Sequence, residues 1–164
     1  MSLSEVSLID HMGTDLTVVN AARVSFGKKK TEFTDGDAKL IKYLADHNHW
    51  SPFGHCSVQF HIKAPVFVAR QLVKHQIGLT WNEISRRYVD NEPEFYTVDV
   101  WRKRAEDKKQ GSDPDNTIEW VNRGERVGSV QYNVEYHALM GYKEMIEAGV
   151  APEQARMILP QSMM

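Results

Sequence analysis

The order of the elements that the sequence predicts assigns this chain to the α+β class. Along its 164 residues, patterns of strand and helix spacing follow one another as strand, two helices, strand, helix, irregular segment and long helix. Hydrophobic residues make up 41% of the chain and charged residues 26%, which is the composition of an ordinary globular domain. We therefore expect a single mixed α/β domain over residues 1–164 with heavy helical cover.

The first part of the chain predicts a strand followed by two helices. Residues 4–12 have the pattern of a short strand, and Asp15 suits the N-cap of the helix that follows. Thr34 and Asp37 have the spacing of a capping box. Apolar residues at helical spacing then predict an amphipathic helix over residues 35–47.

A second strand is predicted from His55 to Lys63, where apolar and polar side chains alternate. The apolar face consists of Cys56, Val58, Phe60 and Ile62. We expect this strand to be half buried, with the Cys56 thiol inert on the apolar side.

The rest of the chain predicts two helices separated by irregular structure, and a last helix that Pro152 opens. Pro65 suits the first turn of a helix that reaches about Gln76. Residues 102–116 combine mixed charges with Gly and Pro, which predicts an exposed, variable loop. Residues 117–148 have a helical pattern in which two early glycines mark a break, and Gly149 suits its C-cap.

The charge balance excludes strong electrostatic attraction to large polyanions. There are 22 acidic and 20 basic residues, so the net charge is -2 and no overall field draws the chain to nucleic acid or to a membrane. Any anion site must therefore be local.

The single cysteine and the N-terminal residues predict a cytoplasmic protein. Cys56 alone permits neither an intrachain disulfide nor a cysteine-based zinc site. The first residues lack the features of a secretion signal, and no apolar run is long enough to cross a bilayer. We expect neither nucleic acid nor a membrane as a partner.

A local anion site is predicted at the end of the helix that follows Pro65. Arg70 and Lys74 are four residues apart, and Gln71 and His75 form a second pair at the same spacing. Arginine binds phosphate through a fork of two hydrogen bonds and lysine acts as a mobile charge. The alternative is an ordinary solvated helix face.

A second polar group follows within a few residues. Amide, carboxylate, hydroxyl and guanidinium groups are supplied by Asn82, Glu83, Ser85, Arg86 and Arg87. Such a set suits a ligand that has both a phosphate and a hydrogen-bonding base. Ser85 lacks the Gly-x-Ser-x-Gly elbow of an acyl-transfer nucleophile, so we do not expect it to act as one.

The histidines suggest an alternative, a metal-dependent hydrolase. His47 and His49 with a third partner would supply imidazole ligands. His55 and His61 share a strand face but lie about 20 Å apart, too far to bind one ion. We expect no metal site.

Six blocks of the sequence resemble, in the same order, those of one family, the flavin-dependent thymidylate synthases. The blocks are AARVSF at 21–26, HNHWSPFGH at 47–55, FHIKAPVFVARQ at 60–71, NEISRRY at 82–88, PEFY at 93–96 and EQARMILP at 153–160. The resemblance implies a small, mostly antiparallel sheet with helices packed on it and a long helix. It also implies a homotetramer with shared active sites.

The resemblance implies methylation of dUMP to dTMP, with methylenetetrahydrofolate as carbon donor and FAD relaying hydride from NADPH. The residues that match the family's FAD contacts are Ser51, Lys74, His75, Gln76 and Glu83, with His49 near the flavin and the path of the folate. Those that match its dUMP contacts are Gln71, Lys74, Glu83, Ser85, Arg86, Arg87 and Arg156. No side chain attacks the pyrimidine in the family, so none is assigned that role here.

The chain departs from the family pattern in two places. The family's Arg-His-Arg, seven residues and Ser read here as Lys74-His75-Gln76, eight residues and Ser85. Gln76 keeps hydrogen bonding without charge, so we expect the flavin affinity or the path of the loop to differ. The family also continues past this chain's last residue into a part that holds the arginine that polarises the dUMP ring. We therefore expect a C-terminally truncated chain, with a noncatalytic FAD- and nucleotide-binding fragment as the alternative.

Overall fold

The computed structural model describes residues 4–107, 111–121 and 123–164. Their contacts divide into two compact units, one formed by Val6–Ile62 and one formed by residues 4–5 together with Lys63–Met164. The single domain over residues 1–164 stays a prediction.

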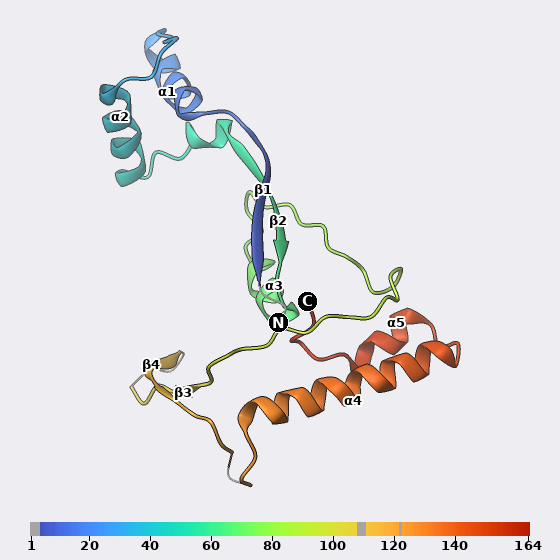
Figure 1. Cartoon of the computed structure of the whole chain (residues 1–164). Coiled ribbons are helices and arrows are strands. Elements are labelled where there is room, and N and C mark those ends of the chain that lie inside the picture. The colour runs from blue at the N-terminus through green and yellow to red at the C-terminus, as the bar shows by residue number, and fades with distance from the viewer. Residues whose placement is uncertain (1–3, 108–110, 122) are drawn as a thin grey trace. The chain divides into compact units, whose positions relative to one another are not determined.

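The first unit contains the strands β1 (Glu5–Met12) and β2 (Ser57–Lys63), which form a two-stranded sheet. β1 runs toward the helix α1 (Asp15–Arg23) and β2 returns from the short helix η2 (Phe53–His55), so the two strands are antiparallel (Figure 1). Both predicted strands are confirmed, but the half-burial of the second is wrong. Val58, Phe60 and Ile62 are 62%, 50% and 37% exposed, because a sheet of two strands buries an apolar face only when another layer covers it.

Two capped helices complete this unit: α1 (Asp15–Arg23), which continues into η1 (Val24–Phe26), and α2 (Asp35–Asp46). The N-cap of α1 is Thr14 rather than Asp15, because the Thr17 hydroxyl accepts the Thr14 N–H at 3.0 Å and closes a capping box. The predicted box at α2 is confirmed, since Asp37 Oδ2 accepts the Thr34 N–H at 2.9 Å.

A buried carboxylate joins the two helices. Asp37 is fully buried; its Oδ1 lies 3.0 Å from Arg23 Nη2 and its Oδ2 accepts a hydrogen bond from Lys30. The Lys30 ammonium, together with the Thr34 hydroxyl, holds the pKa of Asp37 well below its usual range. Asn20 fixes the connecting segment by accepting the Lys30 N–H at 2.8 Å and donating to the Lys30 carbonyl at 3.0 Å.

The second unit begins with α3 (Val66–Leu72), which is shorter than the sequence predicts. Pro65 is the N-cap rather than a first-turn residue, and the helix ends before Lys74 and Gln76 instead of including them. β-branched Val73 is the C-cap, and Gly78 then takes a left-handed φ of 74° that a helix does not contain.

The predicted loop over residues 102–116 contains an antiparallel hairpin in the part that the structure describes. β3 (Arg102–Arg104) pairs with β4 (Ser112–Thr117), with Arg102 opposite Thr117 and a bulge between the two registered pairs. Backbone pairing rather than apolar side chains forms this hairpin, so composition does not reveal it. Most of its residues are exposed, as predicted, and residues 108–110 lie outside the described residues.

The long helix α4 (Val127–Glu147) starts ten residues later than position 117, where the helical pattern begins. Gly124 has a φ of 78°, and Trp120 and Arg126 form an isolated bridge across the turn that precedes the helix. The predicted stop is confirmed, because Gly149 follows the C-cap with a φ of 83° and donates to the Ile146 carbonyl at 2.9 Å. α5 (Pro152–Ala155) and η3 (Arg156–Ile158) then pack against α4.

The last residues of the chain tie α3 and the PEFY segment together. Val66 N–H donates to the Met163 carbonyl at 2.9 Å, and Tyr96 N–H donates to the Ser162 carbonyl at 2.7 Å. Glu135 of α4, 6% exposed, accepts the Ser162 hydroxyl at 2.6 Å and a Gln131 amide N–H at 2.7 Å. This buried network holds the start of α3, and with it the segment that carries most predicted site residues.

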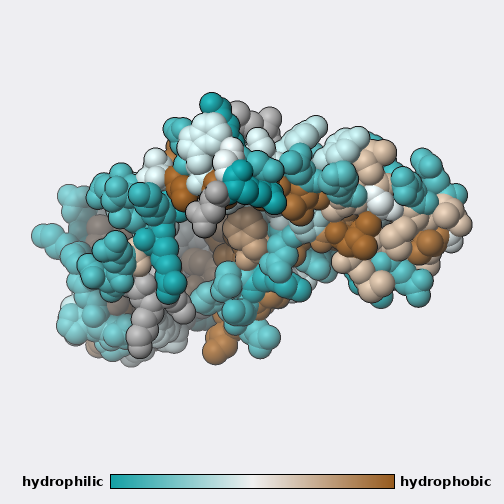
Figure 2. All heavy atoms as spheres, turned by 90° about the horizontal axis from the view of Figure 1, so that it is seen from below, coloured by the Kyte–Doolittle hydropathy of each residue, from teal (hydrophilic) through white to brown (hydrophobic). Residues whose placement is uncertain are grey.

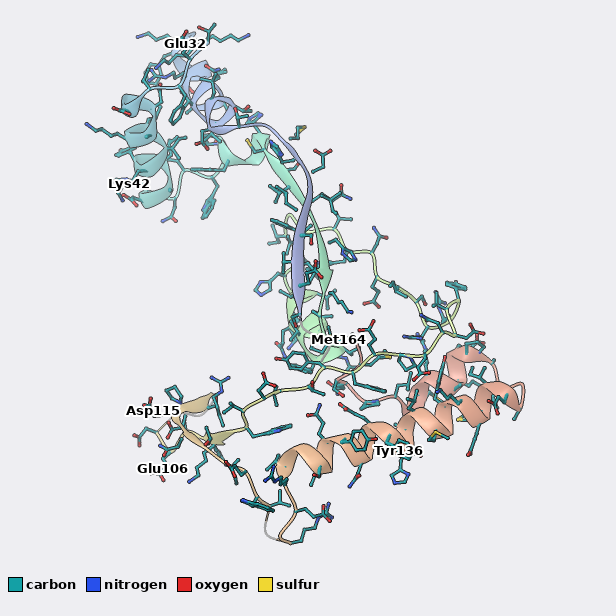
Figure 3. The ribbon with its side chains drawn as sticks, in the orientation of Figure 1. Glu32, Lys42, Glu106, Asp115, Tyr136 and Met164 are labelled. Atoms are coloured by element: carbon teal, nitrogen blue, oxygen red, sulfur yellow. The ribbon has the colours of Figure 1, made fainter. Side chains whose placement is uncertain are left out.

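Many large apolar side chains lie on the surface of both units. They include Val6, Leu8, Ile9 and Met12 on β1, and Tyr132, Val134, Tyr136 and Met140 on α4. Figure 2 shows such hydrophobic residues at the surface among hydrophilic ones, and Figure 3 shows the side chain of Tyr136 on α4. Within the described ranges, no helix combines the length and the apolar character needed to cross a bilayer.

Candidate functional site

The predicted site residues fall into both compact units. His49 and Ser51 belong to the first unit. The second unit holds Gln71, Lys74, His75, Gln76, Glu83, Ser85, Arg86, Arg87 and Arg156. Apart from the half-buried Ser85 and Arg86, all of them are exposed.

Gln71 and Lys74 come together at the end of α3. Lys74 Nζ lies 3.4 Å from Gln71 Oε1, and Gln71 occupies the last turn of the helix. The helical spacing that paired Arg70 with Lys74 does not hold, because α3 ends at Leu72. Within the described ranges the ammonium has a neutral amide as its partner and no carboxylate, so its charge is available to an anion.

His75, Gln76 and Glu83 lie on the irregular segment after α3. The His75 backbone N–H closes a turn on the Leu72 carbonyl at 3.0 Å. Among the described residues, the three side chains make no hydrogen bond or ion pair. Their imidazole, amide and carboxylate groups are therefore available to a ligand.

Ser85, Arg86 and Arg87 share one helical turn. Tyr88 and Val89 N–H both donate to the Ser85 carbonyl, at 3.0 and 3.2 Å. The Ser85 hydroxyl accepts the Arg87 backbone N–H at 3.3 Å and Arg87 Nε at 3.5 Å. Both of these contacts come from Arg87, so the hydroxyl and the guanidinium belong to one local arrangement.

Two neighbours of this turn were missed by sequence reasoning. The Arg87 guanidinium lies 5.0 Å from the centre of the Tyr88 ring, within cation–π range. Arg86 Nη1 donates to Asn91, to Oδ1 at 3.0 Å and also to the backbone carbonyl. The adjacency of Arg87 and Tyr88 was the available signal, whereas the Asn91 contact depends on how the segment folds back.

Arg156 is exposed and lies at the start of η3. Its Nε donates to the Glu153 carbonyl at 3.3 Å, and the preceding Ala155 is fully buried. The neighbouring Ala155 thus anchors this turn, while Arg156 itself is exposed. Within the described ranges, Arg156 makes no hydrogen bond or ion pair with the Ser85–Arg87 turn.

His49 follows the C-terminus of α2, where the chain forms a Schellman motif. Asn48 has a left-handed φ of 57°, its N–H donates to Ala45 at 3.2 Å, and the His49 N–H donates to Leu44 at 2.8 Å. Ser51 lies two residues further on, exposed, before η2 (Phe53–His55).

The metal alternative finds no support at these histidines. His47 Nδ1 lies 2.9 Å from the Tyr43 carbonyl, and its ring stacks on Tyr43. Within the part of the chain that the structure describes, no three His, Cys, Asp or Glu side chains are grouped closely enough to hold an ion. A third ligand for His47 and His49 is therefore lacking there.

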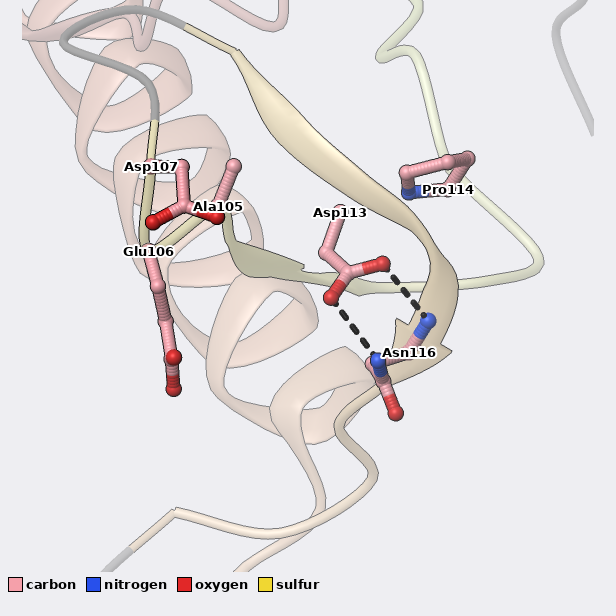
Figure 4. Close-up of a pocket in the computed structure, with 6 residues that line it drawn as sticks. All are labelled: Ala105, Glu106, Asp107, Asp113, Pro114 and Asn116. Atoms are coloured by element: carbon pink, nitrogen blue, oxygen red, sulfur yellow. Dashed lines mark hydrogen bonds between the residues drawn. The ribbon is translucent and has the colours of Figure 1, made fainter.

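One cavity of the described structure is lined by none of the predicted site residues. A cavity of about 320 Å³ at the β3–β4 hairpin is lined by Ala105, Glu106, Asp107, Asp113, Pro114 and Asn116 (Figure 4). Asn116 Nδ2 donates to Asp113 at 2.8 Å, and this bond lowers the pKa of the carboxyl. Carboxylates repel phosphate, so this cavity does not suit a nucleotide.

Comparison with known proteins gives three consistent matches. Residues 7–164 match the family described as thymidylate synthase complementing protein. The chain is 43% identical over 155 residues to a flavin-dependent thymidylate synthase of Thermus thermophilus, covering 94% of this chain and 54% of that protein. It is 42% identical over 156 residues to the enzyme of the same name from Thermosipho africanus, covering 94% and 66%.

A solved structure gives the same result for the fold. The UMP/dUMP methylase PolB from Streptomyces cacaoi, bound with 5-Br dUMP, superposes with a TM-score of 0.77 at 31% identity, covering 99% of this chain and 69% of that one. The predicted α+β fold with small antiparallel sheets and a long helix is confirmed. The chain spans 54% to 66% of the length of the two curated relatives. With 158 of its 164 residues inside the matched region, this chain belongs to the thymidylate synthase complementing protein family.

Proposed function

We propose that this chain carries the nucleotide- and flavin-binding part of a flavin-dependent thymidylate synthase, which methylates dUMP to dTMP. Methylenetetrahydrofolate would be the carbon donor and NADPH the source of the hydride, and the reaction would take place in the cytoplasm. The observation that carries the proposal is the Ser85–Arg87 turn, which presents one hydroxyl and two guanidiniums. Lys74, eleven residues before Ser85 in the sequence, adds a further cation. Relatives named flavin-dependent thymidylate synthase and a solved UMP/dUMP methylase support it.

The phosphate of dUMP is assigned to the Ser85–Arg87 turn. Arg87 is held in place by the Ser85 hydroxyl and the Tyr88 ring, and Arg86 is held by Asn91. Guanidiniums that are already oriented lose little side-chain entropy when they bind a phosphate. Each charge-assisted hydrogen bond would contribute about 1.5–3 kcal/mol. The remaining dUMP contacts in the proposal are Gln71, Lys74, Glu83 and Arg156.

The residues proposed for FAD fit that cofactor by their chemistry. Lys74 supplies a cation for the pyrophosphate, and His75, Gln76 and Glu83 have free donors and acceptors for the polar edge of a flavin. His49 and Ser51 complete the proposed set. When bound, the flavin supplies hydride transfer.

The protein's own part in the reaction is to bind and orient. The Ser85 hydroxyl accepts a hydrogen bond from Arg87. The Cys56 thiol lies 3.7 Å from the Thr14 carbonyl, and both of these residues belong to the first unit. Neither group is set up as a nucleophile. Positioning and electrostatics are therefore the contribution that this chain makes to catalysis.

Self-association into a homotetramer with shared active sites is also proposed. Apolar side chains of β1 and β2 are exposed, with Leu8 at 58% and Phe60 at 50%. Apolar surface of this kind is buried in obligate oligomers. Sedimentation of the purified chain would test this, and a monomer at every concentration would contradict it.

The central proposal is tested by ligand binding. FAD should turn the protein yellow, and dUMP at about 100 times its Kd should raise the melting temperature by roughly 5 to 10 °C. Deoxyuridine, which lacks the phosphate, is the matched control and should raise it much less. Colourless protein whose melting temperature responds to neither ligand would contradict the proposal.

A second candidate is a fragment that binds FAD and nucleotide without turnover. It is favoured by one fact, that the chain spans about half the length of its Thermus relative. Release of tritium from dUMP labelled at carbon 5, with reductant and folate present, separates the two candidates. Binding without release supports the fragment.

A further inference from the structure

An aromatic stack lies at the C-terminus of α2, beside His49. The ring centres of Tyr43 and His47 are 4.0 Å apart with an interplanar angle of 28°, and those of Tyr43 and His49 are 6.1 Å apart at 22°. The imidazole rings of His47 and His49 are therefore both nearly parallel to the Tyr43 ring and within stacking distance of it. All three residues belong to the first unit.

Backbone geometry sets this stack up. Tyr43 and His47 are one helical turn apart on α2, which brings their rings together. Asn48 takes the left-handed conformation, and the Schellman bonds from Asn48 and His49 to Ala45 and Leu44 turn the chain back over the helix end. This reversal brings His49 to Tyr43 although the two are not at helical spacing.

His47 keeps Tyr43 in place. A carbonyl can only accept, so His47 Nδ1 donates to the Tyr43 carbonyl at 2.9 Å, which fixes the imidazole ring against the phenol. The Tyr43 hydroxyl makes no hydrogen bond within the described ranges, and the residue is 52% exposed. Its ring, rather than its hydroxyl, is therefore the functional part.

We propose that Tyr43, supported by His47, is a positioning residue that holds the His49 ring ready to stack on a planar heteroaromatic ligand, a flavin or a pterin. An imidazole on a flexible side chain must be ordered when a ligand binds, and each such ordering lowers affinity. A ring already stacked on Tyr43 has lost that freedom before binding. The inference rests on the proposed function, which places His49 beside the flavin.

The first readout needs no ligand. The ring protons of His49 in the free protein should have chemical shifts displaced from those of a solvated histidine by the ring current of Tyr43. Tyr43→Leu should return them to the position of a solvated histidine, whereas Tyr43→Phe should preserve the displacement. An unchanged His49 signal in Tyr43→Leu would overturn the proposal.

The second readout is affinity, measured for FAD with the free protein and for tetrahydrofolate with the FAD-loaded protein. Tyr43→Leu should weaken at least one of the two by about two- to tenfold, and Tyr43→Phe should restore it. The matched control is Tyr132→Leu, since Tyr132 also stacks on an aromatic residue one turn along a helix, Tyr136 of α4 at 6.1 Å. Equal affinities in Tyr43→Leu and wild type in both arms would overturn the proposal.

A third variant keeps the proposal testable if Tyr43→Leu fails to fold. His47→Ala keeps the Tyr43 residue but removes its support, and it should shift the His49 signal and the affinity in the same direction as Tyr43→Leu by a smaller amount. Absence of both effects would overturn the inference alone. Wild-type protein that binds no FAD would instead overturn the proposed function, and this inference with it.

Discussion

The α1–α2 pair and the segment from Gln71 to Asn91 use the same basic residue types in opposite settings. In the helical pair, Arg23 and Lys30 both bind the buried carboxylate of Asp37. In the segment, and among the residues that the structure describes, the partner of Lys74 is a neutral amide and those of Arg87 are a hydroxyl and an aromatic ring. A cation with a buried anionic partner serves the fold, whereas one held by neutral groups keeps its charge for a ligand.

The largest effect should come from removing the anion of the first setting. Asp37→Asn leaves Arg23 and Lys30 without their shared carboxylate, and should lower the melting temperature by roughly 10 °C. Asp35→Asn is the matched control, because Asp35 is exposed in the first turn of the same helix. Equal melting temperatures for the two variants would show that the buried network does not stabilise the fold.

Acid should reproduce part of that loss. The pKa of Asp37 is lowered in the folded state from an ordinary value of 3.8, so its stabilising contribution is complete above that value and declines as the pH falls below it. The melting temperatures of the wild type and of Asp37→Asn should therefore approach each other progressively as the pH falls below about 4. A difference that stays constant down to pH 2.5 would contradict this.

In the second setting, the expected effect is on binding rather than on stability. Arg87→Ala removes the guanidinium assigned to the phosphate and should weaken dUMP binding by about ten- to hundredfold, measured by titration calorimetry. Arg104→Ala, on an exposed position of β3, should leave the affinity unchanged. If both variants bind as the wild type does, the phosphate lies elsewhere.

A smaller gain is expected at Gln76. Gln76→Arg restores the second cation of the family's Arg-His-Arg pattern and should tighten FAD binding by about three- to tenfold. Gln59→Arg adds the same charge at an exposed position of β2 and serves as the control. A decrease in FAD affinity would show that the inserted residue has changed the path of this segment.

The smallest effect should come from a cation that neither binds a buried carboxylate nor belongs to the proposed ligand site. Lys42 pairs with Asp46 at 2.7 Å on the exposed face of α2, with its side chain 75% exposed. Lys42→Ala should change the free energy of unfolding by about 0.3–0.5 kcal/mol and leave ligand binding unaltered. Denaturant unfolding would measure the change, and a loss as large as that of Asp37→Asn would remove the distinction between the two settings.

The sequence by itself determined the features that depend on neighbours a few residues apart. The capping box of Thr34 and Asp37, the helix that follows it and the stop at Gly149 are formed by hydrogen bonds within one or two turns. The ordered motif blocks were also sufficient to identify the family. They record residue identity, which needs no knowledge of packing.

Only the tertiary structure decided where distant segments pair. α3 ends at Leu72, α4 starts at Val127, and a hairpin occupies part of residues 102–117, although local propensity favoured other boundaries. The charge pairing of Asp37 and the stacking of His49 on Tyr43 likewise join residues through the folded chain. Burial and non-local hydrogen bonds are properties of the whole arrangement, so the pattern of a single segment does not contain them.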